Sequence, residues 1–171
     1  MQKEKIRYTF IPTSLGLVAI AKSQKGICFL GLGEREVLEK EIKHFFPQAN
    51  LEQLDPAFLE KLTYQIENPQ KQLSWQLDMQ GTAFQQKVWS ILLTIPPGQT
   101  RTYSWLAQQV GNPRAIRAVA RACSQNKIAI LIPCHRIIRK NGKISGYKWG
   151  SELKRKLILK EKNSYLLNPE T

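Results

Sequence analysis

The sequence has few metal-ligating or disulfide-forming residues and little that could enter a membrane. Its three cysteines are odd in number and lack the CxxC spacing, and its two histidines, His44 and His135, do not extend them into a zinc-ligand pattern. An apolar stretch at residues 15–21 is too short for a signal core or a membrane span. We therefore expect a cytoplasmic protein without a bound metal and without membrane contact.

Acidic residues are absent between Gly81 and Ser151. Residues 1–80 hold ten basic and ten acidic side chains, whereas residues 81–171 hold sixteen basic and three acidic ones, which accounts for the whole net charge of +13. A surface kept basic only for solubility normally mixes both signs, so this distribution favours nucleic-acid contact. It also predicts a domain boundary, with one domain at 1–80 and another at 81–171.

The first part of the sequence has the patterns of a small sheet with helices. β-Branched and aromatic runs bounded by glycine predict strands, and apolar residues at helical spacing predict helices. Asp55-Pro56 is typical of a helix start, with an N-cap and proline at the first helical position. The expected strands are 6–10, 16–21, 26–30 and 73–77, and the expected helices are 34–46 and 57–66.

The second part is mainly helical in pattern. Thr82 to Gln85 form a capping box before an apolar helix, and a short helix at 104–110, a Gly-Asn-Pro turn and a basic helix at 114–124 together predict a helix-turn-helix. We expect residues 130–138 to be extended, Asn141-Gly142 to form a turn, and Ser151 to cap a final helix that reaches about residue 162.

Residues 132–136, Ile-Pro-Cys-His-Arg, place Cys134 beside His135 and Arg136. A thiolate is the nucleophilic form of cysteine, and neighbouring cations lower a cysteine pKa. On the residues alone the alternative is a buried and inert cysteine. The motif thus makes Cys134 a candidate nucleophile within a basic region.

Five segments together resemble one family, the O6-alkylguanine-DNA alkyltransferases, also called methylated-DNA–protein-cysteine methyltransferases. They are GTAFQQKVW at 81–89, TYSWLA at 102–107, GNPRAIRAVARAC at 111–123, IPCHRII at 132–138 and SGYKWG at 145–150. The whole sequence is most similar to the C-terminal half of the bacterial adaptive-response alkyltransferases. Because it begins at Met1, we expect a stand-alone protein.

The resemblance implies an α/β (α+β) fold. Its first part would be a ribonuclease-H-like subdomain with a small sheet, and its second a mainly helical, winged-helix-like subdomain that carries the helix-turn-helix. It further implies repair of O6-alkylguanine in double-stranded DNA by a single-use transfer of the alkyl group to Cys134, with O4-alkylthymine as a second candidate substrate. The implied protein is a monomer and uses no cofactor.

The resemblance also implies roles for individual residues. Cys134 would react, His135 would assist it through a water, Glu161 would orient His135, Tyr103 would donate a proton to the guanine, and Asn126 would join the recognition helix to the reacting segment. The implied DNA-binding residues are Arg114, Ala115, Arg117, Ala118, Arg121 and Arg136. The implied substrate pocket contains Tyr147, Lys148 and Trp149.

Within this assignment Arg117 would fill the space of the flipped base, and Ala115, Ala118 and Ala122 would let the helix approach a narrow groove. Cys28 and Cys123 are interpreted as small apolar fillers. Two alternatives remain from the sequence: a non-catalytic DNA-binding regulator that reads sequence with residues 114–124, and a thiol hydrolase that uses Cys134 and His135. The acid-free run disfavours the second.

Overall fold

The computed structural model describes residues 4–144 and 146–167, so Ser145 of the SGYKWG segment lies outside the described residues. The chain forms two compact units. The first takes Met1–Asn68, Leu73–Met79 and Lys127–Ala129, and the second takes Pro69–Gln72, Gln80–Asn126 and Ile130–Thr171. The predicted division cuts the chain once, between residues 80 and 81, whereas each of these units takes three separate segments. The predicted domain boundary stays a prediction.

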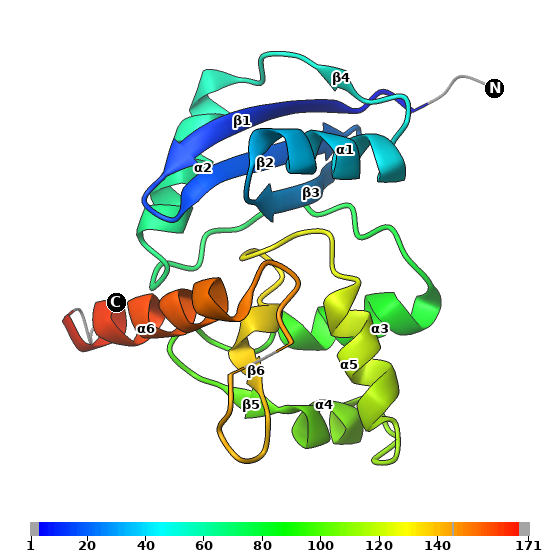
Figure 1. Cartoon of the computed structure of the whole chain (residues 1–171), viewed down its shortest axis with the longest axis vertical. Coiled ribbons are helices and arrows are strands. Elements are labelled where there is room, and N and C mark those ends of the chain that lie inside the picture. The colour runs from blue at the N-terminus through cyan, green and yellow to red at the C-terminus, as the bar shows by residue number, and fades with distance from the viewer. Residues whose placement is uncertain (1–3, 145, 168–171) are drawn as a thin grey trace. The chain divides into compact units, whose positions relative to one another are not determined.

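The first unit is built on a four-stranded sheet with the order β3-β2-β1-β4 (Figure 1). The antiparallel strands β1, β2 and β3 follow one another in the chain, and the short β4 pairs parallel to β1. The strands are β1 Arg7–Thr13, β2 Gly16–Ser23, β3 Gly26–Leu32 and β4 Asn50–Leu51. Three of the predicted strands therefore form, each a few residues longer than expected.

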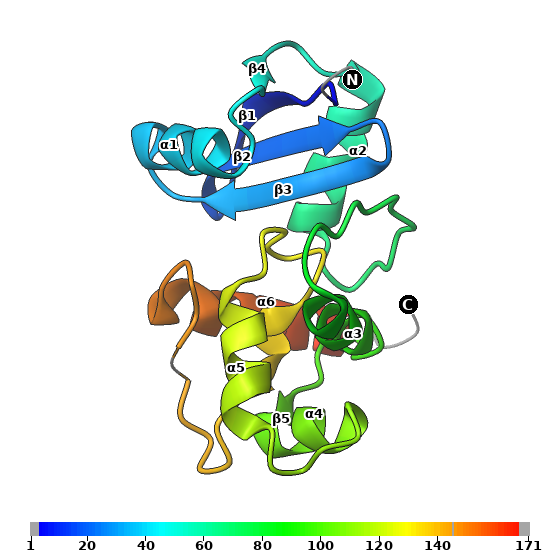
Figure 2. The same ribbon diagram turned by 90° about the vertical axis from the view of Figure 1, so that its right-hand side faces the viewer.

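Two helices, α1 (Arg35–Phe45) and α2 (Pro56–Glu67), cover opposite faces of this sheet (Figure 2). Side chains alternate between the two faces of a strand, so β2 contributes side chains to the packing of both helices. Ala19 and Ala21 join the core beneath α1, whereas Lys22 lies against Phe58 of α2. Asp55 caps α2 by accepting from the Ala57 backbone amide, as predicted.

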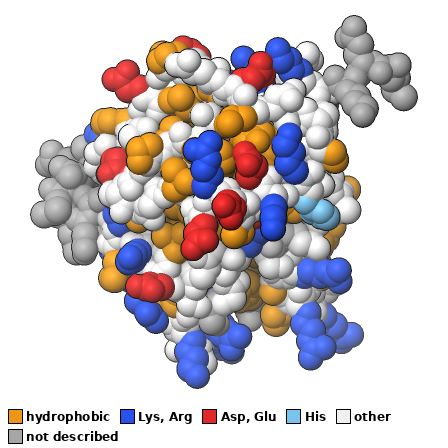
Figure 3. Space-filling model, turned by 45° about the horizontal axis from the view of Figure 1, so that its top comes forward, with side chains coloured by type: hydrophobic (Ala, Val, Ile, Leu, Met, Phe, Trp, Pro, Cys, Tyr) orange, Lys and Arg blue, Asp and Glu red, His pale blue; other side chains and the backbone are white. Residues whose placement is uncertain are grey.

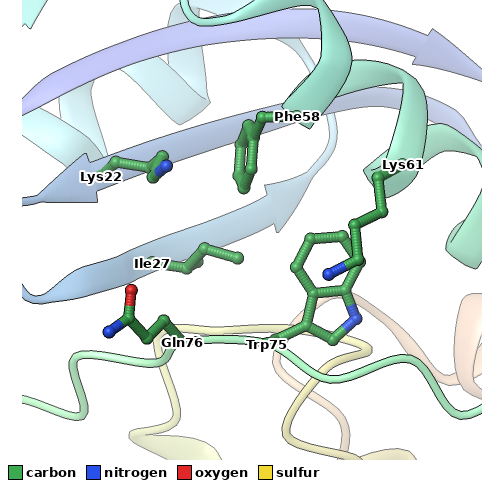
Figure 4. Close-up of a pocket in the computed structure, with 6 residues that line it drawn as sticks. All are labelled: Lys22, Ile27, Phe58, Lys61, Trp75 and Gln76. Atoms are coloured by element: carbon green, nitrogen blue, oxygen red, sulfur yellow. The ribbon is translucent and has the colours of Figure 1, made fainter.

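A shallow pocket opens beside α2 (Figure 4). The Lys22 ammonium lies 4.0 Å from the Phe58 ring centroid, and the Lys61 ammonium lies 4.2 Å from that of Trp75. Lys22 is half-buried and Lys61 is exposed. Both lysines thus rest on aromatic faces and keep their charges near water.

The predicted strand at 73–77 does not form. Only Leu77 makes an isolated bridge, to Ile27, and the Ile27 amide donates to the Gln76 carbonyl at 2.9 Å. A Cβ at Gly26 would lie 2.4 Å from that carbonyl oxygen, so glycine permits the close approach. Residues 73–77 therefore run beside β3 and are hydrogen-bonded to it at Ile27, without forming a strand.

The second unit contains helices α3 (Ala83–Leu92), α4 (Tyr103–Gln109), α5 (Ile116–Ser124) and α6 (Ser151–Leu167), and a two-stranded pair of β5 (Arg101–Thr102) with β6 (Ile137–Ile138). The predicted capping box at Thr82 and Gln85 is present. Helices α4 and α5 form the predicted helix-turn-helix, and Trp89 of α3 donates to the Ala122 carbonyl at 2.9 Å. This bond fixes α5 against α3.

Two predicted elements of the second unit differ from the structure. The helix expected over 114–124 begins at Ile116, because the Asn112 side chain accepts from the Arg114 amide and holds the preceding residues in a turn. The segment expected to be extended over 130–138 contains Ile130 in the left-handed region (φ 69°) and a 3₁₀ turn, η1, at Cys134–Arg136. Only its last two residues, Ile137–Ile138, form a strand, β6, which pairs parallel with β5.

Candidate functional site

Cys134 begins the 3₁₀ turn η1 and is almost completely buried, with 4% of its surface exposed. The fully buried Asn126 follows helix α5 and holds this segment in place. Its Nδ2 donates to the Ile132 carbonyl at 3.0 Å and to Cys134 Sγ at 3.3 Å. One amide group therefore fixes both the backbone before the turn and the sulfur.

The electrostatics of Cys134 differ from the sequence expectation. Burial raises the pKa of the thiol, against the Asn126 hydrogen bond and the charges of Lys154 and Lys148, which lower it. The expectation that His135 and Arg136 would lower the Cys134 pKa is wrong, because both side chains are directed to Glu161. Burial therefore opposes formation of the thiolate, which is the reactive form of the side chain.

A buried chain of charged groups follows Cys134. His135 Nε2 is hydrogen-bonded to Glu161 Oε1, and Arg136 Nε donates to Glu161 Oε2 at 2.8 Å. Arg136 Nη1 also donates to the Ile95 carbonyl at 2.6 Å, and the Gly98 amide donates to Glu161 Oε2 at 3.2 Å. Both carboxylate oxygens are therefore occupied, and the His135 ring is fixed.

The charge state of Glu161 follows from these contacts. Burial alone would raise the pKa of its carboxyl group, but the charges and hydrogen bonds of His135 and Arg136 outweigh burial and lower the pKa. An ionised Glu161 accepts from His135 Nε2–H, which leaves Nδ1 as the basic nitrogen. This Nδ1 is buried and has no hydrogen-bond partner among the described residues.

Tyr103 is the first residue of α4 and is partly buried near the two cysteines of this unit. Burial, followed by the influence of Cys123 and Cys134, raises the pKa of its phenol to about 12. The phenol therefore keeps its proton at neutral pH and can donate it. A Cβ built on Gly146 would lie 3.9 Å from the Tyr103 hydroxyl, so the loop that carries Gly146 passes close to this donor.

The predicted pocket residues form an aromatic cluster near His135. The Tyr147 ring contacts His135 edge-on at 6.4 Å between centroids and Trp149 at 5.2 Å. The Lys148 ammonium lies 5.2 Å from the Trp149 ring centroid. The Tyr147 hydroxyl and the Trp149 Nε1 are buried without a partner among residues 4–144 and 146–167, so both offer hydrogen-bonding capacity to a ligand.

Helix α5 presents basic and small side chains to solvent on one side. Arg117, Ala118 and Arg121 are exposed, whereas Val119, Ala122 and Cys123 are buried on the other side. Of the residues before the helix, Arg114 is exposed and Ala115 is half-buried. On the face drawn in Figure 3, both signs of charge mix in the upper part, while the charged side chains along the lower edge are Lys and Arg.

Two of the residues predicted for DNA contact lie elsewhere. Arg136 is buried and occupied by Glu161 and Ile95, so the structure gives it a role in holding Glu161 and not in reaching a phosphate. Ala122 faces α3 and is 2% exposed, so it does not contribute to a small outer face of α5. Arg136 is buried because its charged partner, Glu161, is buried as well and compensates its charge.

One buried residue near Cys134 was not predicted. Lys154 in α6 is 1% exposed and lies on the same helical side as Leu157, Ile158 and Glu161, which are also buried. The spacing of these four residues was the available sequence signal, because two charged residues share the apolar stripe of one helix.

Within the described ranges, no cluster of three or more histidine, cysteine or acidic side chains could hold a metal ion. Over the same ranges, no helix combines the length and the apolar content that a membrane span requires.

Comparison with protein families gives two matches that together cover most of the chain. Residues 6–69 match the 6-O-methylguanine DNA methyltransferase, ribonuclease-like domain, and residues 83–163 match the 6-O-methylguanine DNA methyltransferase, DNA binding domain.

Individual proteins agree with these matches. The chain is 42% identical over 160 residues to the Escherichia coli bifunctional transcriptional activator/DNA repair enzyme Ada, and the alignment spans 91% of this chain but 45% of that protein. It is 37% identical over 163 residues to the methylated-DNA–protein-cysteine methyltransferase of Mycobacterium tuberculosis, spanning 92% of this chain and 93% of that one. The structure of the M. tuberculosis protein in complex with DNA is similar, with a TM-score of 0.78, 34% identity, and coverage of 92% and 94% of the two chains.

Proposed function

Because the chain belongs to the O6-methylguanine DNA methyltransferase family, we propose that it repairs double-stranded DNA by a single-use transfer of the alkyl group of O6-alkylguanine to Cys134. The predicted family and fold class are confirmed, and the M. tuberculosis methyltransferase, which aligns over most of both chains, supports the proposed activity. The chain spans about half the length of the Ada protein, so the transcriptional activity in that protein's name is not assigned to this chain.

The observation that carries the proposal is the position of Cys134 between two fixed groups. Asn126 donates to the Cys134 sulfur. The next residue is His135, and its Nε2 is held by Glu161, which is buried and ionised. Nucleophilic catalysis by cysteine requires a base near the thiol and a group that orients the base. His135 and Glu161 supply these two parts.

The proposed transfer begins with removal of the Cys134 proton. A bridging water would pass this proton to His135 Nδ1, the buried nitrogen without a partner among the described residues. The thiolate then attacks the alkyl carbon, so that a carbon–sulfur bond forms while the bond from carbon to guanine O6 breaks. Tyr103 donates its proton to the released guanine, and its phenolate recovers a proton from His135 through solvent.

The product is a thioether, and this explains the proposed single use. A thioether lacks the electrophilic carbonyl of an acyl-thioester, so water cannot readily regenerate the thiol. The chemistry requires no cofactor because the alkyl group moves with the electrons of sulfur and oxygen alone.

DNA binding is proposed for helix α5 and the turn before it. Arg117 would occupy the space of the flipped guanine, Arg114 and Arg121 would contact phosphates, and Ala115 and Ala118 would allow close approach to the minor groove. Tyr147, Lys148 and Trp149 would surround the flipped base. In this proposal residues 81–171 bind DNA and transfer the alkyl group, and the protein acts as a cytoplasmic monomer.

The direct test uses a duplex oligonucleotide that carries one O6-methylguanine. After incubation with the protein, digestion and mass spectrometry should find one methyl group on the Cys134 peptide for each lesion repaired, and the DNA should contain guanine. A duplex with O4-methylthymine tests the second substrate. Binding of the lesion duplex without methylation of any cysteine would identify a recognition module and overturn the proposed reaction.

A further inference from the structure

The pocket beside α2 belongs to the first unit and has no part in the proposed reaction. It has a volume of about 210 Å³ and is lined by β2, β3, α2 and the irregular segment 73–77 (Figure 4). Small-molecule sites are typically hollows with apolar walls and a few polar groups. This pocket has two basic, two aromatic, one aliphatic and one amide side chain and no acidic one: Lys22, Lys61, Phe58, Trp75, Ile27 and Gln76.

The sheet supplies one side of the pocket through a β-bulge. Lys22 of β2 pairs with Ile27 of β3, whereas the preceding Ala21 pairs with Phe29, so Cys28 is an extra residue on β3. Paired side chains lie on the same face of a sheet. Lys22 and Ile27 therefore both lie toward α2, while Phe29 packs in the core beneath α1. Bulges redirect side chains in this way and are frequent beside functional sites.

The side of the pocket formed by Trp75 is fixed by hydrogen bonds, although its segment is not a strand. Gln65 of α2 is buried, and its Oε1 accepts from the Trp75 indole N–H at 3.1 Å and from the Leu73 amide at 3.0 Å. The Trp75 ring meets Phe58 edge-on, with 6.0 Å between the ring centroids. The aromatic part of the pocket is thus formed before any ligand arrives.

Two ammonium groups lie against these two rings. Lys22 is placed over Phe58 and Lys61 over Trp75. Lys61 also donates to the Ser74 carbonyl at 2.6 Å and keeps its other N–H groups for a second acceptor. Within residues 4–144 and 146–167, neither lysine forms an ion pair with an acidic side chain. Two positive charges therefore lie beside aromatic surface without an anion to compensate them.

We propose that this pocket binds the terminal phosphate monoester of a nucleotide, with the nucleobase against the aromatic rings. A phosphate monoester carries a charge of about −1.5 to −2 at pH 7, which matches two ammonium groups better than the single charge of a carboxylate does. Lysine binds phosphate as a point charge, and nucleobases pack well on aromatic side chains. A free nucleotide and the 5′ end of a DNA strand share this chemistry. The inference does not depend on the proposed function.

The first experiment titrates the protein with adenosine 5′-monophosphate by calorimetry at low salt. Adenine is chosen because the proposed repair acts on guanine and thymine. We expect saturable binding with a Kd below about 1 mM. Adenosine, inorganic phosphate and the dicarboxylate glutarate should each bind about tenfold more weakly or not at all, because each lacks part of the recognised group. Glutarate that binds as tightly as the nucleotide would overturn the inference.

Substitutions locate the binding. A double variant, Lys22→Met with Lys61→Met, removes both charges, and Lys40→Met makes the same change at an exposed position of α1. The double variant should bind the nucleotide at least about tenfold more weakly, and its remaining binding should depend less on salt. Lys40→Met should not differ from the natural sequence. Unchanged affinity in a folded double variant would show the inference to be wrong.

NMR of the natural sequence replaces this test if the double variant does not fold. Adenosine 5′-monophosphate should shift the indole N–H signal of Trp75 and leave those of Trp89 and Trp105 in place. An unmoved Trp75 signal contradicts the inference. A shift confined to Trp149 does so as well, because it would place the nucleotide in the proposed substrate pocket.

A matched pair of single-stranded adenine oligonucleotides, one with a 5′-phosphate and one with a 5′-hydroxyl, separates the two sources of the phosphate. Tighter binding of the phosphorylated strand that is lost in the double variant identifies the strand end as the ligand. Equal binding of the two strands, with the mononucleotide still bound, identifies a free nucleotide. Methyl transfer by the double variant should match that of the natural sequence, so a failure of the proposed function leaves this test intact.

Discussion

Cys28 in the first unit and Cys134 in the second are buried to nearly the same extent, yet their surroundings differ. Cys28 lies in β3, where burial and then the charges of Asp78 and Glu4 raise the pKa of its thiol to about 12. Cys134 receives a hydrogen bond from Asn126 and the positive charge of Lys154, and an oriented histidine follows it. Burial alone makes a thiol inert, so reactivity in this protein must come from the groups placed around the sulfur.

The largest difference between the two cysteines should appear on their removal. Cys134→Ala should abolish methyl transfer because no other thiol is oriented for attack, while lesion-duplex binding should persist. Cys28→Ala should leave the transfer rate unchanged within about twofold and affect only packing. Quantifying restored guanine after a single turnover checks both, and activity in Cys134→Ala would contradict the proposed nucleophile.

His135→Gln tests the base that Cys28 lacks. A positioned general base contributes about 10²–10⁴-fold to a rate, so we expect single-turnover transfer to fall within that range. The loss should shrink at high pH, where the thiolate forms without the base. A uniform loss at every pH, with unchanged DNA affinity, would assign His135 a packing role instead.

Glu161→Gln tests the buried charges that have no counterpart around Cys28. Removing one partner leaves Arg136 buried and uncompensated, so the free energy of unfolding at pH 7 should fall by about 3–5 kcal/mol. Because the folded pKa of Glu161 is lowered, its contribution is fully present above the unfolded value near 4.5 and is lost as pH falls through the folded pKa. Urea unfolding between pH 3 and 7 should show this slope in the natural protein and a weaker one in Glu161→Gln.

The smallest expected effect concerns the charge distribution of the two parts of the sequence. Arg121→Ala on the exposed side of α5 should weaken duplex binding at all sequences and reduce the slope of log K against log salt by about one. The matched change Arg35→Ala, in the charge-balanced part of the sequence, should leave that slope unchanged. Equal effects from both variants would place the DNA surface elsewhere.

Elements with local sequence signals were predictable. The N-cap at Asp55, the capping box at Thr82 and Gln85, and the turn before α5 depend on neighbouring residues, and the structure has all three. Family motifs added the positions of Cys134, His135 and Glu161, which the fold brings together. Their catalytic roles stay predictions until they are tested.

Features that depend on distant residues were not predictable. Residues 130–138 have the composition of a strand, but a side chain from Asn126 and the left-handed Ile130 impose a compact turn. Arg136 has the sequence character of a DNA-binding residue, and its bonds to Glu161, twenty-five positions later, and to the Ile95 carbonyl explain why it is buried. Lys154 resembles the other lysines of its helix until the packing of that helix is known.

The segment Lys127–Ala129 lies inside the stretch that matches the DNA binding domain, yet it belongs to the first unit. Its backbone exchanges two hydrogen bonds with Leu30 of β3, at 2.9 and 2.8 Å. A recombinant fragment that begins at residue 81 would keep Cys134 but leave the Lys127 carbonyl and the Ala129 amide, seven and five positions before it, without their partner on β3. A protein shortened between the two matched stretches, 6–69 and 83–163, would therefore lose the pairing of Lys127–Ala129 with β3. Both stretches should be kept together when the protein is shortened or fused to another.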